Sequence, residues 1–81
     1  MKSKYQPRVL KALEDAPVSV RKAFFKQVKF LETDLRHPSL HAKKYAENLD
    51  FWQARVSKNW RFYFTIEDGA YVIQDIIKHP K

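Results

Sequence analysis

Two arginines, Arg55 and Arg61, are the side chains of this sequence best suited to binding an anion. They lie in a stretch, 51–66, where apolar and polar residues alternate. Because successive side chains of a strand point to opposite faces, this alternation predicts two amphipathic strands. Gln53 and Tyr63 fall on the same polar face as the arginines. A guanidinium group is a rigid fork of donors that matches a phosphate, so we predict an anion-binding face centred on Arg55.

Each of these side chains also has a structural interpretation. Arg55 could be an ordinary solvated residue of a strand. Arg61 could pair with Asp75 or Glu67, and we expect this structural role for it. Tyr63 could stack on a nucleobase, since every base offers an aromatic face.

The remaining candidates are histidines and lysines. His79 has the ordinary pKa near 6.5 that suits proton transfer, although a histidine beside Pro80 could also be a frayed chain end. Lys43 and Lys44 would contact phosphate if RNA binds, and are otherwise common surface lysines.

A metal site is not expected from the sequence. His37 and His41 are four residues apart, a spacing found in zinc sites on helices, but no third ligand follows at a suitable distance. The chain contains no cysteine, which excludes disulfides and thiolate chemistry.

The composition describes one small basic domain, 1–81. Sixteen Lys and Arg against nine Asp and Glu give a net charge of +7. Such a charge attracts polyanions, namely nucleic acid, an acidic protein or a membrane surface, or it serves solubility alone. No apolar run reaches the roughly 20 residues of a membrane span. We therefore expect a cytoplasmic protein that does not bind a membrane.

Two helices should come first in the chain. Pro7 suits the first turn of a helix, and Pro17 ends that helix at Ala16. The chain should leave the second helix at His37, before Pro38. The apolar residues at helical spacing predict the buried stripes: Val9, Leu10, Leu13 and Ala16 in the first helix, and Val20, Phe24, Phe25, Val28, Phe30, Leu31 and Leu35 in the second.

Three strands should follow, joined by two tight turns. Lys58-Asn59 is the first turn, and Asp68-Gly69 is the strongest hairpin signal in the chain. A third strand then runs from about Tyr71 to Lys78. A simple register would place Asp75 on the apolar face, so either a cation pairs with it or a bulge shifts the register. Trp52 and Trp60 should face the helices.

These pieces, in this order, resemble the RelE/ParE family of toxins from bacterial type II toxin–antitoxin pairs. The resemblance rests on the helical hairpin, 37–40 with Lys43-Lys44, 52–56, 60–64 and 75–79. It implies an α+β, microbial-RNase-like fold, in which a helical hairpin packs on one face of a three- to four-stranded antiparallel sheet. The family usually has a further N-terminal strand, and residues 1–6 could hold a short one at best.

The resemblance also implies a function. RelE-like members cut mRNA in the ribosomal A site without a metal, and ParE-like members block DNA gyrase. We favour a cofactor-free endoribonuclease that acts on mRNA on the ribosome and is neutralised by a cognate antitoxin. The alternatives are a non-catalytic gyrase inhibitor and a degenerate module that only binds RNA or antitoxin.

By this resemblance, the catalytic work falls to a lysine before the central sheet, arginines on the sheet face and a His or Tyr near the C-terminus. The matching catalytic candidates are Arg55, His79, Lys44 and Lys43. The RNA-binding candidates are Arg61, Tyr63, Gln53, Lys58 and Lys81.

Overall fold

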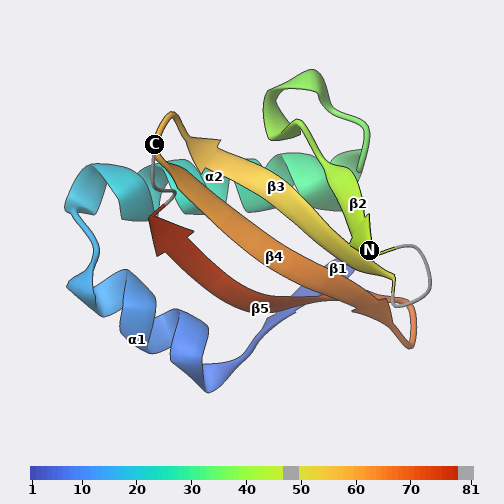
Figure 1. Cartoon of the computed structure of the whole chain (residues 1–81). Coiled ribbons are helices and arrows are strands. Elements are labelled where there is room, and N and C mark those ends of the chain that lie inside the picture. Colours follow the sequence, from blue (N-terminus) through green and yellow to red (C-terminus); the bar gives the residue numbers. More distant parts are fainter. Residues whose placement is uncertain (47–49, 79–81) are drawn as a thin grey trace.

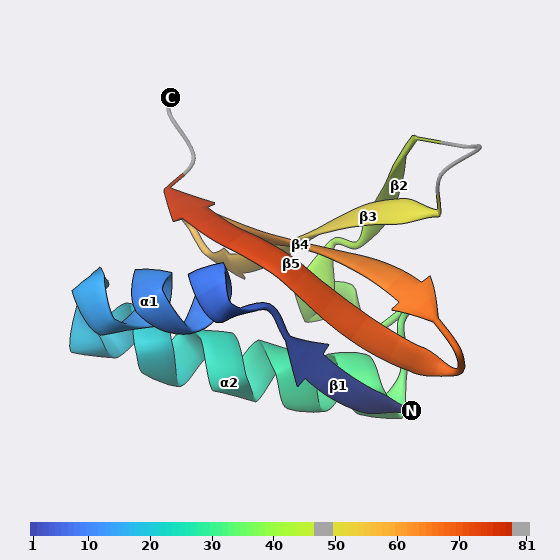
Figure 2. The same cartoon turned by 90° about the horizontal axis from the view of Figure 1, so that it is seen from below.

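The fold has two layers, a helical layer and a sheet. A computed structural model describes residues 1–46 and 50–78. Figure 2 shows both helices on one side of the sheet, so the other face is left open. The elements, in chain order (Figure 1), are β1 (Lys2–Tyr5), α1 (Pro7–Asp15), α2 (Val18–Thr33), the short 3-10 helix η1 (Pro38–Leu40), β2 (Lys43–Ala46), β3 (Phe51–Ser57), β4 (Trp60–Glu67) and β5 (Ala70–Lys78).

The α+β class predicted from the sequence is confirmed, but the sheet has five strands where three or four were expected. Their order is β1-β5-β4-β3-β2. β1 is parallel to β5, and the other neighbours are antiparallel. β1 and β2 have four residues each and lie at the two edges. Strands this short show no clear alternation, so local sequence marks them poorly.

A bulge in β5 resolves the register of Asp75. From the Asp68-Gly69 turn the strands pair as expected up to Phe64 opposite Ile73, and then the register shifts so that Tyr63 lies opposite Asp75. The shift moves the carboxylate from the apolar face to the open face. The bulge alternative is therefore confirmed, and it avoids burying an unpaired charge.

The core lies between the open sheet and the two helices. Phe24 of α2 meets Phe62 of β4 edge to face, with 5.4 Å between the ring centroids. Trp52 and Trp60 are half-buried and pack against this core from its rim. The largest fully buried side chains are Phe24, Phe62, Phe64, Leu31, Leu40, Ile73 and Val9.

Three details of the helices differ from the prediction. Leu10 and Phe25, expected in the core, are 51% and 45% exposed. α2 ends at Thr33, because Asp34 already has an extended backbone, so the helix does not continue to His37. The helices bury only a narrow stripe each, and residues one position off the stripe face solvent.

The burial difference between two adjacent phenylalanines gives a matched test of the core. Phe24→Ala should destabilise the protein by about 3–5 kcal/mol, because it leaves a cavity against Phe62. Phe25→Ala removes the same atoms from an exposed site and should cost about 1 kcal/mol or less. Urea denaturation of the two variants measures both values, and equal losses would contradict this packing.

Candidate functional site

The open face of the sheet contains a basic groove of about 480 Å³. We call it the arginine groove. It runs over β2, β3 and β4, and His41, the residue that follows η1, also lines it. Its described lining contains four basic side chains and no carboxylate, so its potential favours an anion. The lining residues are His41, Lys43, Tyr45, Gln53, Arg55, Arg61 and Tyr63.

Arg55 lines this groove from β3, the middle one of the three strands that carry it. β3 pairs with β4 so that Arg55 stands directly opposite Arg61, and like charges in that position repel each other. The Arg55 Nε atom is buried, and no described residue accepts its hydrogen bond. A buried donor without an acceptor is costly. A bound phosphate would supply that acceptor and would also screen the two guanidinium groups from each other.

Arg61 holds the β3–β4 turn together. Its Nη1 atom donates to the carbonyl oxygens of Ser57 at 2.8 Å, Trp60 at 2.9 Å and Lys58 at 3.3 Å. The expected structural role is thus observed, but its partners are turn carbonyls and not Asp75 or Glu67. The guanidinium remains part of the groove lining.

The two adjacent lysines lie on opposite faces. Lys43 pairs with Gln53 and lines the arginine groove. Lys44 pairs with Trp52, its Nζ atom lies 6.0 Å from the centroid of that ring, and it forms an ion pair with Asp50 at 3.6 Å. The structure therefore brings Lys43 to Arg55 and does not bring Lys44 there.

His41 is a groove residue that the sequence analysis missed as a candidate for chemistry. It follows η1 with a left-handed backbone, φ 46°, which a non-glycine residue adopts only where its surroundings hold it. Its position two residues before Lys43, a predicted catalytic residue, was the sequence signal that could have identified it as a site residue. Among the described lining residues, it alone carries an imidazole ring.

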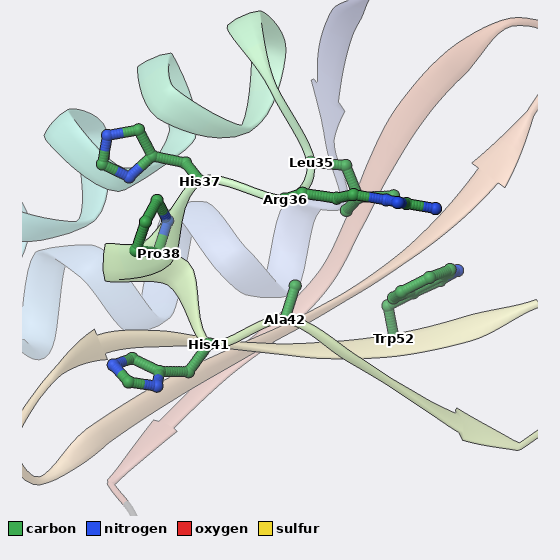
Figure 3. Close-up of a pocket in the computed structure, with 7 residues that line it drawn as sticks. All are labelled: Leu35, Arg36, His37, Pro38, His41, Ala42 and Trp52. Carbon is green, nitrogen blue, oxygen red and sulfur yellow. The ribbon is translucent and has the colours of Figure 1, made fainter.

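A second hollow lies on the helix side of β2, next to the arginine groove. It measures about 330 Å³, and Figure 3 shows Arg36 and Trp52 at one end of it and His41 at the other. His37 stacks on Phe30 with 3.9 Å between the ring centroids. In the described part of the chain, no three residues of the His, Cys, Asp and Glu types lie together as metal ligands would.

Gln27 connects the helical layer to the groove. It is the one polar side chain in the described core, with 7% of its surface exposed. Its Nε2 atom donates to the carbonyl oxygens of Arg55 and Ser39, both at 2.9 Å, and its Oε1 atom accepts from Ser39 Oγ at 3.2 Å. A glutamine within the apolar stripe of α2 was the sequence signal for this contact, which fixes β3 and η1 relative to each other.

Three aromatic side chains form a cluster beside the groove. Phe51 and Tyr63 stack with 5.7 Å between their centroids, and Tyr45 meets both rings edge to face at 6.1 Å. Tyr45 is 64% exposed. An exposed aromatic cluster next to cationic groups is typical of surfaces that bind single-stranded nucleic acid.

The remaining candidates are spread out. Gln53 lies opposite Tyr63 in the groove. Lys58 is exposed in the β3–β4 turn, at the end of the hairpin. His79 and Lys81 lie outside the described residues, and their roles stay predictions.

Two tyrosines with altered pKa values lie away from the groove. Burial raises the pKa of Tyr5, and the carboxylate of Glu32 raises it further. Burial and the carboxylate of Asp34 likewise raise the pKa of Tyr71. Both side chains pack in the core between the sheet and α2, so these shifts describe packing and mark no reactive group.

Comparison with known proteins identifies the fold. At the sequence level the chain matches no protein-family model and no curated protein. Its structure superposes on the archaeal RelE–RelB complex from Pyrococcus horikoshii OT3 with a TM-score of 0.83 at 19% identity, over 99% of this chain and 96% of that one. For the YoeB/ParE toxin from Agrobacterium tumefaciens the TM-score is 0.81 at 9% identity, over 99% and 100%.

A third match, the isolated RelE toxin of E. coli, has a TM-score of 0.77 at 16% identity, over 99% of this chain and 85% of that one. The chain therefore has the fold of RelE and YoeB toxins, and the resemblance predicted from the order of its sequence pieces is confirmed at the level of fold. Within its described residues, no helix is long and apolar enough to cross a membrane.

The Gln27 contacts predict a measurable stability effect. Gln27→Leu keeps the side-chain size but leaves the carbonyl oxygens of Arg55 and Ser39 without their donor, so the free energy of unfolding should fall by about 1–3 kcal/mol. Gln53→Leu makes the same change on the open face and should stay within about 0.5 kcal/mol of the parent. Chemical denaturation tests both, and a Gln27→Leu protein as stable as its parent would contradict the role of this network.

Proposed function

We propose that this chain is the toxin of a type II toxin–antitoxin pair and acts in the cytoplasm as an endoribonuclease on ribosome-bound mRNA. The observation that carries the proposal is the arginine groove, in which the buried Nε donor of Arg55 has no hydrogen-bond partner among the described residues. The fold shared with RelE and YoeB toxins supports it. Several of those structures are toxin–antitoxin complexes, which supports a cognate antitoxin as the partner here.

RNA cleavage by side chains alone requires charge stabilisation and two proton transfers. The 2′-oxygen attacks the adjacent phosphorus, the bond from phosphorus to the 5′-oxygen breaks, and a 2′,3′-cyclic phosphate remains. Negative charge grows on the phosphate oxygens at that moment, and pre-positioned donors stabilise it. Arg55 is the groove residue suited to this task, and Lys43 adds a second positive charge.

The proton transfers need groups that exchange protons near neutral pH. His41 places an imidazole, the side chain most often used for such transfers, in the groove. His79 is the group that the family resemblance assigns to the same task. We assign one transfer to each: a base accepts the 2′-hydroxyl proton, and an acid protonates the departing 5′-oxygen. No metal or other cofactor takes part in the proposed reaction.

The first test is removal of Arg55. Induced in a bacterial host, the parent chain should produce cuts at codon positions in ribosome-bound mRNA. Arg55→Ala should lower cutting by about 100-fold or more, because the transition-state charge loses its main donor. Lys29→Ala removes one positive charge from the exposed side of α2 and should cut like the parent. The cut ends are mapped by primer extension.

The same experiment separates the alternative functions. Growth arrest without mRNA cuts, together with loss of DNA supercoiling by gyrase, would favour the gyrase-inhibiting toxin. A chain that neither arrests growth nor cuts mRNA would be a degenerate binding module. Either outcome overturns the endoribonuclease proposal.

The second test concerns proton transfer. His41→Ala and His79→Ala should each lower the cutting rate in a cell-free translation system by about 100-fold, within the range for loss of a general acid or base. His37→Asn is the control, because it removes an imidazole but keeps an acceptor near the Ser39 N–H, which His37 Nδ1 accepts at 3.2 Å. Parent-like cutting by His41→Ala would remove His41 from the mechanism.

A further inference from the structure

A third, polar hollow adjoins the arginine groove on the open face. It measures about 340 Å³, within the range of sites for small ligands. Tyr45 and Tyr63 line both this hollow and the arginine groove, so they form the wall between the two. The residues that line this third hollow are Arg8, Tyr45, Phe51, Tyr63, Gln74 and Asp75.

The bulge in β5 is what brings two polar side chains into this hollow. In a regular strand, Gln74 and Asp75 would point to opposite faces. The extra residue between the Ile73 and Asp75 pairing positions breaks that alternation, and both side chains line the same hollow. β1 pairs only with residues 70–73 of β5. Gln74 and Asp75 therefore have β4 on one side and no described strand on the other.

The hydrogen bonds around Gln74 fix which way its amide points. Thr65 Oγ1 donates its one proton to Glu67 Oε2 at 2.6 Å, because a carboxylate only accepts. Thr65 Oγ1 must then accept from Gln74, whose Nε2 atom lies at 2.9 Å. The amide nitrogen of Gln74 is thereby held at Thr65, and its Oε1 atom remains an acceptor for a ligand.

Asp75 offers a second acceptor. Its Oδ1 atom accepts the N–H of Ile76 at 2.9 Å, and no other described residue forms a hydrogen bond or ion pair with Oδ2. The hollow thus combines two free acceptors, one of them charged, with an aromatic wall made of Phe51, Tyr63 and Tyr45.

An aromatic wall with an acceptor-rich edge selects among the nucleobases. All four bases can stack on the rings, since each has a π-face. Guanine alone presents two neighbouring donors, the N1–H and the N2 amino group, to a carboxylate. Adenine and cytosine each present one amino group, and uracil presents a single N–H between two carbonyl oxygens that the two acceptors would repel.

We infer that this hollow is a guanine-binding subsite, in which the base stacks on Phe51 and Tyr63 while Asp75 and Gln74 accept hydrogen bonds from its N1–H and N2 amino group. The inference rests on the proposed RNA function and adds base specificity to it. The adjoining arginine groove would hold a phosphate of the same strand, and Arg8 lies at the subsite to contact the ribose phosphate.

The test measures nucleotide binding directly and does not depend on cleavage. Guanosine, inosine and adenosine 5′-monophosphates are titrated into the purified chain and followed by NMR shifts of the Tyr45 and Tyr63 rings. Guanosine monophosphate should bind at least about tenfold more tightly than adenosine monophosphate, and inosine monophosphate, which lacks the N2 amino group, should fall between them.

Asp75→Asn should remove this preference, because the amide replaces a charged acceptor. Asp68→Asn makes the same change in the β4–β5 turn, at a left-handed position that asparagine tolerates, and should keep it. Since Asp75→Asn could disturb the bulge, Tyr63→Leu serves as a second variant and should weaken all three nucleotides alike. Circular dichroism confirms that each variant is folded.

The outcomes separate this inference from the proposed function. Equal affinity for the three nucleotides, or an unchanged preference in a folded Asp75→Asn protein, overturns the guanine subsite even if the parent chain cuts mRNA. Selective guanosine monophosphate binding by a chain that cuts no mRNA supports the subsite and overturns the nuclease proposal.

Discussion

The burial of one aromatic face of the β3–β4 hairpin under α2 is the interaction on which the rest of this structure depends. Phe62 and Phe64 are fully buried, and Phe24 meets Phe62 from the helix. Because side chains alternate along a strand, burying this face forces Arg55, Arg61 and Tyr63 onto the other one. The same hydrophobic contact that stabilises the domain thereby gathers its cationic residues on the open face.

Polar contacts then add precision to this arrangement at a few points. Gln27 hydrogen-bonds the backbone of β3 at Arg55 and the backbone of η1 at Ser39, so the layer that forms the core also positions the groove. Arg61 holds the β3–β4 turn through three carbonyl oxygens. A buried amide whose hydrogen bonds are formed makes its surroundings more rigid, although it places a polar group in an otherwise apolar core.

Irregular backbone brings side chains to the open face that regular strands would direct elsewhere. The β5 bulge brings Asp75 to the open face beside Tyr63, and His41, whose backbone is left-handed, lines the groove. Bulges and strained positions occur often at functional sites because they re-aim side chains. Here both lie within one continuous surface, which combines a cationic groove with an aromatic, acceptor-rich hollow.

Elements with local signals could be predicted from the order of residues alone. Alternation predicted β3 and β4 and the polar face that carries Arg55, and Asp68-Gly69 predicted the turn, where both residues have positive φ. The order of the pieces was sufficient to recognise the toxin fold.

Tertiary structure decided what depends on partners distant in the chain. The edge strands β1 and β2 form because β5 and β3 offer them hydrogen bonds, not because four residues favour a strand. Lys43 and Lys44 look equivalent in sequence, and only the pairing of β2 with β3 sends one to the groove and the other to Asp50. Gln27 and His41 join the site for the same physical reason, since their contacts span layers that no local pattern can relate.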